Sequence, residues 1–228
     1  MPRISISIDG PTASGKTTLA TSLAQTLGLA FLDTGLTYRS LAYALTRESA
    51  EGLRSELGSV LEHRPVVYDK SVSGRPVKRH GIFLHGEEIT EKIWDVSLDD
   101  NLKTVAKDPV WRQLILCMHQ DIAEEHENIV AVGRDVAVTL LPAAHLQIYL
   151  TASLAVRRER RRAQYRDMRD RSATVGPATA RDVENRAAVR ALPNSLEIQS
   201  TYLPASAVLA CALNGLENKK GATTHELP

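Results

Sequence analysis

Four residues near the N-terminus have the types and spacing of a phosphate-binding loop. Gly10, Gly15, Lys16 and Thr17 match the pattern G-x-x-x-x-G-K-[ST]. Glycines allow a tight turn whose N–H groups point inward and, with a helix N-terminus, hold phosphate oxygens. We expect Lys16 to reach the β- and γ-phosphates of ATP and Thr17 to bind Mg²⁺. The predicted nucleotide-binding residues are Gly10, Thr12, Ala13, Ser14, Gly15, Lys16, Thr17 and Thr18.

The segments on either side of this loop have the pattern that the motif requires. Residues 4–8 alternate isoleucine with serine, which is typical of a strand, and Leu19, Leu23 and Leu27 recur at helical spacing. A glycine-rich turn with a chance lysine is the alternative. The strand, loop and helix in succession favour nucleoside triphosphate binding instead.

Composition limits the class of protein. A chain of 228 residues with 43% hydrophobic content fits one α/β domain over 1–228 that carries small insertions. The 28 basic and 27 acidic residues give a net charge of +1, so charge does not favour nucleic acid or a membrane surface as partner. With no apolar signal segment or membrane-length stretch, the chain is expected to be cytoplasmic. Cys117 and Cys211 lack metal-ligand spacing and are expected to be buried.

Two further segments are predicted to reach the ligand side of a parallel sheet. The apolar run 29–32 ends at Asp33-Thr34-Gly35, where we expect a loop on the same edge as the phosphate loop. The buried strand 128–132 ends at Gly133-Arg134-Asp135, and charges at such a place are costly unless they are used. Asp135 is a candidate to orient the acceptor, and Arg134 to reach a phosphate. An internal salt bridge is the alternative.

These segments together resemble bacterial-type cytidylate kinases. The resemblance rests on 9–11 (Asp-Gly-Pro), on 32–35 with Tyr38 and Arg39 following, and on 133–135. It extends to a short hairpin at 85–90 and a helix start at 108–112, and it covers the chain up to about Ala152. It implies a three-layer P-loop kinase fold with a parallel central sheet. It also implies an acceptor-binding insertion at 48–95, a lid at 157–190, and a monomer.

The resemblance also implies roles for particular residues. Arg39 and Arg112 fall where the family clamps the acceptor monophosphate, and the planar fork of arginine suits a phosphate dianion. A structural salt bridge is the alternative for each. The predicted acceptor-binding residues are Asp33, Thr34, Gly35, Tyr38, Arg39, Lys103, Arg112, Arg134, Asp135, Arg181 and Arg186. The predicted catalytic residues are Lys16, Arg134, Asp135, Arg158 and Arg162.

A strongly basic helix follows the strand 146–150. It is predicted to be capped by 151–153, and its five arginines lack the aromatic residues that a nucleic-acid site would need. In a P-loop kinase such arginines belong to the lid, where they neutralise charge on the transferring phosphate. Arg158 and Arg162, four apart, are expected to share a face. A helix at 179–191, a final strand at 195–200, a helix at 205–216 and a frayed polar tail complete the prediction.

The sequence departs from the family on the acceptor side. Lys103 stands where a serine usually helps to read cytosine, and Trp94 stands where an arginine is usual. Ala137 and Val138 replace a glycine and a threonine, and Asn185 replaces an aspartate. The phosphoryl-transfer half of the site is therefore better supported than the half that reads the base.

The predicted function is transfer of the γ-phosphoryl group of ATP to a small-molecule acceptor, most directly the phosphate of CMP or dCMP. One alternative is a relative that phosphorylates a different small molecule in a specialised biosynthetic pathway. Another is a nucleotide-binding module without turnover. Lys103 can only donate hydrogen bonds, and the cytosine amine is also a donor. The sequence therefore predicts either weak discrimination in favour of CMP or a physiological acceptor other than CMP.

Overall fold

The computed structural model describes residues 3–69, 76–78, 80–164 and 175–223, and within them it contains two β-sheets. The larger sheet has seven strands in the order β10-β9-β1-β8-β2-β4-β5, and the smaller has three in the order β3-β6-β7. The strands of the large sheet are β1 (Ser5–Asp9), β2 (Ala30–Asp33), β4 (Val66–Tyr68), β5 (Pro76–Lys78), β8 (Ile129–Val132), β9 (Leu146–Thr151) and β10 (Ser195–Gln199). Those of the small sheet are β3 (Leu61–Arg64), β6 (Gly81–Leu84) and β7 (Glu87–Glu88).

Five strands of the large sheet are parallel. Ile8 of β1 lies opposite Val132 of β8 on one side and Ile148 of β9 on the other. Strand β8 is buried along its whole length, as in parallel sheets covered by helices on both faces. β4 pairs antiparallel with β2, and β5 antiparallel with β4, so the predicted parallel sheet has an antiparallel edge.

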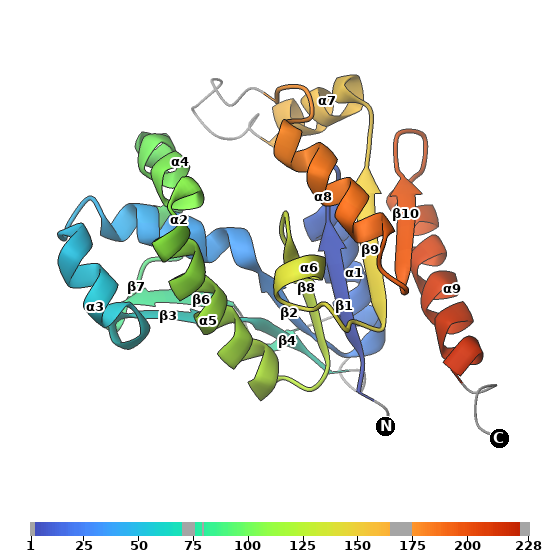
Figure 1. Cartoon of the computed structure of the whole chain (residues 1–228), viewed down its shortest axis with the longest axis horizontal. Helices are drawn as coiled ribbons and strands as arrows, with labels where there is room; N and C mark the ends of the chain where they lie inside the picture. The colour runs from blue at the N-terminus through green and yellow to red at the C-terminus, as the bar shows by residue number, and fades with distance from the viewer. Residues whose placement is uncertain (1–2, 70–75, 79, 165–174, 224–228) are drawn as a thin grey trace.

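Helices cover both faces of this sheet, which confirms the predicted three-layer α/β fold (Figure 1). Helices α1 (Lys16–Leu27) and α9 (Ala205–Thr223) pack on one face, over a core that includes Ile6, Leu23 and Ile148. Helices α6 (Val136–Thr139) and α8 (Ala180–Arg190) pack on the other. The parallel strands of this sheet end on one side, close to α7 (Leu154–Gln164).

The small sheet lies in a second lobe, to the left in Figure 1, with a core of its own around Leu53, Ile82 and Trp111. Its hairpin turns at His85 and Gly86, which both have positive φ (49° and 77°), so the hairpin predicted there is confirmed. The elements around it are α2 (Thr34–Ala44), α3 (Ala50–Val60), η1 (Lys92–Trp94), η2 (Val96–Leu98), α4 (Asp99–Lys107) and α5 (Pro109–Glu125). Segment 48–95 thus contributes strands to both sheets.

Helix boundaries follow local capping. The Ser153 hydroxyl accepts the Val156 N–H (3.4 Å) at the start of α7. A reciprocal capping box between Thr179 and Asp182 starts α8. The predicted mobile loop from Tyr165 to Thr179 lies outside the described residues as far as 174. No helix in the described part of the chain combines the length and apolar character that crossing a membrane requires.

Three expectations are wrong. There is no loop at 33–35, because the Asp33 carboxylate accepts the Gly35 N–H (3.1 Å) and caps α2, which begins at Thr34. Helix α9 continues to Thr223, so the tail is helical beyond Glu217. Cys117 and Cys211 are both exposed, because each lies on the outer side of a helix that is buried only along one stripe.

Candidate active site

The phosphate loop joins β1 to α1 and lies tightly against β9. Gly10 has φ 145°, and a Cβ atom there would come 2.0 Å from the Leu150 carbonyl oxygen. Gly15 has φ 103° and precedes the first residue of α1. Side chains are excluded from the first position by contact and disfavoured at the second by backbone conformation. The loop therefore needs both glycines to form.

Lys16 lies over the loop. Its Nζ atom donates to the carbonyl oxygens of Gly10 (2.8 Å) and Pro11 (3.0 Å). Burial lowers the pKa of the ammonium group to about 8, against the opposing effect of Asp33. The side chain is therefore mostly charged at neutral pH and is held beside the loop by weak acceptors, which phosphate oxygens can replace.

Thr17 and Asp33 bring two oxygen ligands together next to the loop. The Thr17 hydroxyl donates to Asp33 Oδ2 (3.3 Å), and burial raises the pKa of Asp33 while Lys16 opposes this. Hydroxyl and carboxylate oxygens suit Mg²⁺, which usually takes one or two protein ligands plus phosphates and water. No cluster of three or more His, Cys, Asp or Glu residues that could hold a metal exists among the described residues. The two oxygens fit an ion that is bound together with a nucleotide.

Asp9 ties the phosphate loop to the turn after β8, a connection that the sequence analysis missed. Its buried carboxylate accepts the N–H groups of Val136 and Ala137, both at 2.8 Å. Burial raises the pKa of Asp9 to about 6. A Cβ atom at Gly133 would come 2.6 Å from the Thr34 hydroxyl oxygen. Asp9 therefore holds the turn on one side, and Thr34 packs closely against it on the other. In the sequence, the only sign of this connection was the aspartate directly before the loop motif.

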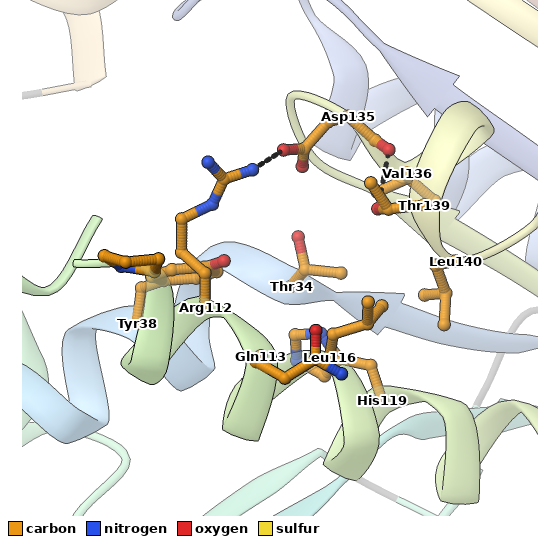
Figure 2. Close-up of a pocket in the computed structure, with 11 residues that line it drawn as sticks. Thr34, Tyr38, Arg112, Gln113, Leu116, His119, Asp135, Val136, Thr139 and Leu140 are labelled. Carbon is orange, nitrogen blue, oxygen red and sulfur yellow. Dashed lines mark hydrogen bonds and ion pairs between the residues drawn. The ribbon is translucent and has the colours of Figure 1, made fainter. Parts of the chain in front are cut away.

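A cavity of about 230 Å³ lies beside this turn, between α2, α5 and α6 (Figure 2). Asp135 Oδ2 accepts hydrogen bonds from both Arg112 and Arg181, each at 2.7 Å. Arg112 Nε is buried and has no hydrogen-bond partner in the described part of the chain. The cavity is lined by Thr34, Tyr38, Pro109, Arg112, Gln113, Leu116, His119, Asp135, Val136, Thr139 and Leu140.

Arginines from two segments contact the phosphate loop. Arg134 donates to the Thr12 hydroxyl (3.0 Å), and its contact with a phosphate stays a prediction. From α7, Arg157 reaches the Thr12 carbonyl (3.3 Å) and Arg160 the Ser14 carbonyl (2.8 Å). Sequence reasoning selected other members of this basic helix, since five arginines in six positions do not reveal which face meets the loop.

The arginines selected from α7 and α8 lie in different places. Arg158 bonds the Val175 carbonyl (3.0 Å), and Arg162 is exposed. Arg181 joins Asp135 at the cavity, whereas Arg186 pairs with Glu197 of β10. The lid roles proposed for these side chains stay predictions.

The remaining acceptor candidates divide into those at the cavity and those away from it. Thr34 and Tyr38 line the cavity. Arg39 stacks on the Trp94 ring, with its guanidinium carbon 5.3 Å from the ring centroid. Lys103 bonds Asp100 (2.8 Å), and its side chain is 69% exposed. Arg39 and Lys103 do not line the cavity, so their contact with an acceptor stays a prediction.

A phosphate loop at the carboxyl edge of a mostly parallel, helix-covered sheet defines the class of P-loop nucleotide-binding α/β proteins. Within that class, the family model for cytidylate kinase matches residues 6–216. The chain belongs to the cytidylate kinase family.

Two relatives agree with this assignment by sequence. The chain is 38% identical to the cytidylate kinase of Thermotoga maritima over 162 residues, which cover 70% of this chain and 69% of that one. It is also 38% identical to the cytidylate kinase of Streptococcus thermophilus, over 71% of this chain and 70% of that one. Among solved structures, a gluconokinase from Sinorhizobium meliloti aligns over 99% of this chain and 98% of its own, with 15% identity and a TM-score of 0.49.

Proposed function

We propose that this protein transfers the γ-phosphoryl group of ATP to the phosphate of a pyrimidine nucleoside monophosphate, CMP or dCMP. The observation that carries the proposal is that the phosphate loop and the 230 Å³ cavity share one edge of the sheet. Asp9 connects the loop to the turn that carries Asp135, and Arg134 of that turn contacts Thr12. A donor on the loop and an acceptor in the cavity would therefore be held next to each other, and such positioning is the main requirement of phosphoryl transfer.

The polar groups of the cavity complement cytosine. Cytosine presents an amine, which donates, beside a ring nitrogen and a carbonyl, which accept. Asp135 can accept from the amine, while Arg112, whose Nε lacks a partner in the described residues, can donate to the ring nitrogen or carbonyl. Uracil has a carbonyl in place of the amine and would place it against the carboxylate. The cavity thus favours CMP over UMP, in contrast to the discrimination expected from Lys103.

Charge neutralisation would come from this chain's own cations. Lys16 and Arg134 lie at the loop, and Arg157 and Arg160 reach it from α7. Thr17 and Asp33 would hold Mg²⁺, which supplies further neutralisation of the phosphate oxygens when it is bound with ATP. We also propose that 157–190 acts as a lid, that 48–95 serves acceptor binding, and that the protein is a cytoplasmic monomer.

The test is ADP release with ATP, Mg²⁺ and a panel of acceptors that includes CMP, dCMP, UMP, AMP and GMP. We expect CMP and dCMP to have the highest kcat/KM. The panel is extended with other phosphorylated or hydroxylated small molecules, and a higher kcat/KM for one of these would favour a relative that phosphorylates a different small molecule. ATP binding in calorimetry without turnover on any acceptor would favour the nucleotide-binding module without turnover.

A further inference from the structure

Three buried polar side chains form a hydrogen-bonded chain between two cavities. Thr37 of α2 places its Oγ1 atom 2.7 Å from Nδ1 of His63 and 2.8 Å from Nε2 of His119. The exposed fractions are 0% for Thr37, 5% for His63 and 3% for His119. His119 lines the 230 Å³ cavity, and His63 lines a second one of about 400 Å³ between α3, β3, β4 and α5. The proposed reaction has so far used none of the three.

Both histidines are neutral at physiological pH. Burial lowers the pKa of His119 to about 4 and that of His63 to about 3, the latter with a contribution from the neighbouring His119. In a neutral imidazole one ring nitrogen donates and the other accepts. The Thr37 hydroxyl has one proton, so it can donate to one histidine only, and the other histidine must then donate to the hydroxyl oxygen.

This restriction couples the two rings. If Thr37 donates to His63, then His119 carries its proton on Nε2, and its Nδ1 is an acceptor. If Thr37 donates to His119, the proton of His119 moves to Nδ1, which becomes a donor. Nδ1 of His119 has no hydrogen-bond partner among the described residues, and it is not fully enclosed by protein atoms. The direction of one hydroxyl therefore sets whether this ring edge donates or accepts.

We propose that His119 is a specificity-determining residue of the acceptor cavity, and that Thr37 and His63 are positioning residues that fix its hydrogen-bonding polarity. The group that His119 would contact is the polar edge of a heterocyclic base. This inference rests on the proposed function, which gives the acceptor such a base. His119 lies on α5, away from Asp135 on the opposite side of Thr34 (Figure 2). It can therefore meet a part of the acceptor that Asp135 and Arg112 do not reach.

The first experiment compares two substitutions on the same helix. Thr37→Val removes the hydroxyl between the histidines at nearly constant volume. Ser40→Ala removes another fully buried hydroxyl of α2, which bonds only the Leu36 carbonyl within its own helix (2.7 Å). We expect Thr37→Val to raise the KM for CMP about tenfold with kcat within twofold, and Ser40→Ala to leave both unchanged. Thr37→Ser should restore the wild-type KM. Equal KM values in Thr37→Val and Ser40→Ala would overturn the proposal.

The second experiment reads the tautomer directly and does not depend on turnover. In ¹⁵N NMR spectra of the free wild-type protein, His119 should show one protonated and one unprotonated ring nitrogen. His63→Phe removes one partner of Thr37, so His119 should then sample both tautomers and give averaged shifts. Averaged shifts already in the wild type would refute the fixed polarity of His119, and unchanged shifts in His63→Phe would refute its coupling to His63. Inactivity of the wild type on every nucleotide, with the tautomer fixed as expected, would instead count against the proposed function.

Discussion

The donor half and the acceptor half of the candidate site are built in different ways. The donor half is the phosphate loop, which is contiguous in sequence and uses mainly backbone groups and one lysine. The acceptor half is the cavity whose walls come from α2, α5, α6 and Asp135 before it, with Arg181 of α8 bonded to Asp135. A contiguous site depends on local conformation, whereas a distributed one depends on how distant elements pack.

The two halves also differ in what holds them. In the donor half, position 10 must be glycine, because the loop packs so closely against the Leu150 carbonyl that no side chain fits. Asp135 is fixed by charge, between Arg112 and Arg181, and all three side chains are between 28% and 40% exposed. Water screens such pairs, so a charged ligand can compete for them. We therefore expect the donor half to be rigid and the acceptor half to adjust on binding.

The largest effect is expected in the donor half. Lys16→Ala removes a preorganised charge that stabilises the transition state more than the bound substrates, so kcat should fall about a thousandfold. Steady-state ADP release measures it. Lys92→Ala, an exposed lysine paired with Glu87 in the other lobe, is the matched control and should keep full activity. Near-normal turnover of Lys16→Ala would remove the phosphate loop from the mechanism.

In the acceptor half, Asp135→Asn should lower kcat/KM for CMP between tenfold and a hundredfold, since one base-reading contact is worth about 1–3 kcal/mol. The loss for UMP should be smaller, so the preference for CMP should narrow. Asp95→Asn changes an exposed carboxylate that bonds the Ser97 N–H (2.8 Å) and serves as the control. An equal loss for both acceptors would mean that Asp135 does not read the base.

Arg112→Lys keeps the charge but loses the planar fork, so the acceptor KM should rise about tenfold while the KM for ATP stays constant. Competition by cytidine, which lacks the phosphate, separates the two interpretations of this residue. Weaker cytidine inhibition of the variant would place Arg112 at the base. Unchanged inhibition would place it at the acceptor phosphate. Equal weakening of ATP and CMP binding would make it structural.

The buried histidines make the acceptor half sensitive to acid. His119 has a folded-state pKa of about 4, below its usual 6.5, so the unfolded state binds more protons between these values. Stability is therefore full above pH 6.5 and falls on acidification, by about 1.4 kcal/mol per pH unit for each such histidine.

Urea unfolding of wild type and His119→Gln at pH 7.5 and pH 5 measures this slope. The variant should lose less stability on acidification than the wild type, by about 2 kcal/mol. Asp9, with its pKa raised to about 6, contributes a slope of opposite sign, but it is present in both proteins and cancels in the comparison. Identical losses of stability in the two proteins would mean that His119 binds a proton at pH 5 in the folded protein as readily as in the unfolded one.

The smallest effect is expected from Lys103→Ser. The side chain is exposed and bonded to Asp100 within α4, away from the cavity. The ratio of kcat/KM for CMP and UMP should change less than twofold. A tenfold change in this ratio would mean that Lys103 contacts the acceptor base, as the sequence suggested.

Much of the fold could be predicted from the sequence because its signals are local. The apolar runs at 29–32 and 128–132 predicted β2 and β8, and Asp108 with Pro109 marked the start of α5. The loop expected at 33–35 was wrong because an aspartate before a threonine and a glycine can cap a helix as well as close a turn. Asp135 was a candidate from its place after a buried strand, and Arg112 from the family resemblance. Their pairing with each other was predicted from neither.

By itself, the sequence determined the phosphate loop, its glycines and its lysine, because the spacing of 10–17 fixes both the backbone turn and the helix that follows. Only the tertiary structure decided which arginines of α7 meet that loop, that Asp9 braces the turn at Asp135, and that Thr37 joins His63 to His119. These contacts link residues separated by 26 to 146 positions. No local pattern encodes such pairs, since they depend on the register of strands and on which face of each helix is buried.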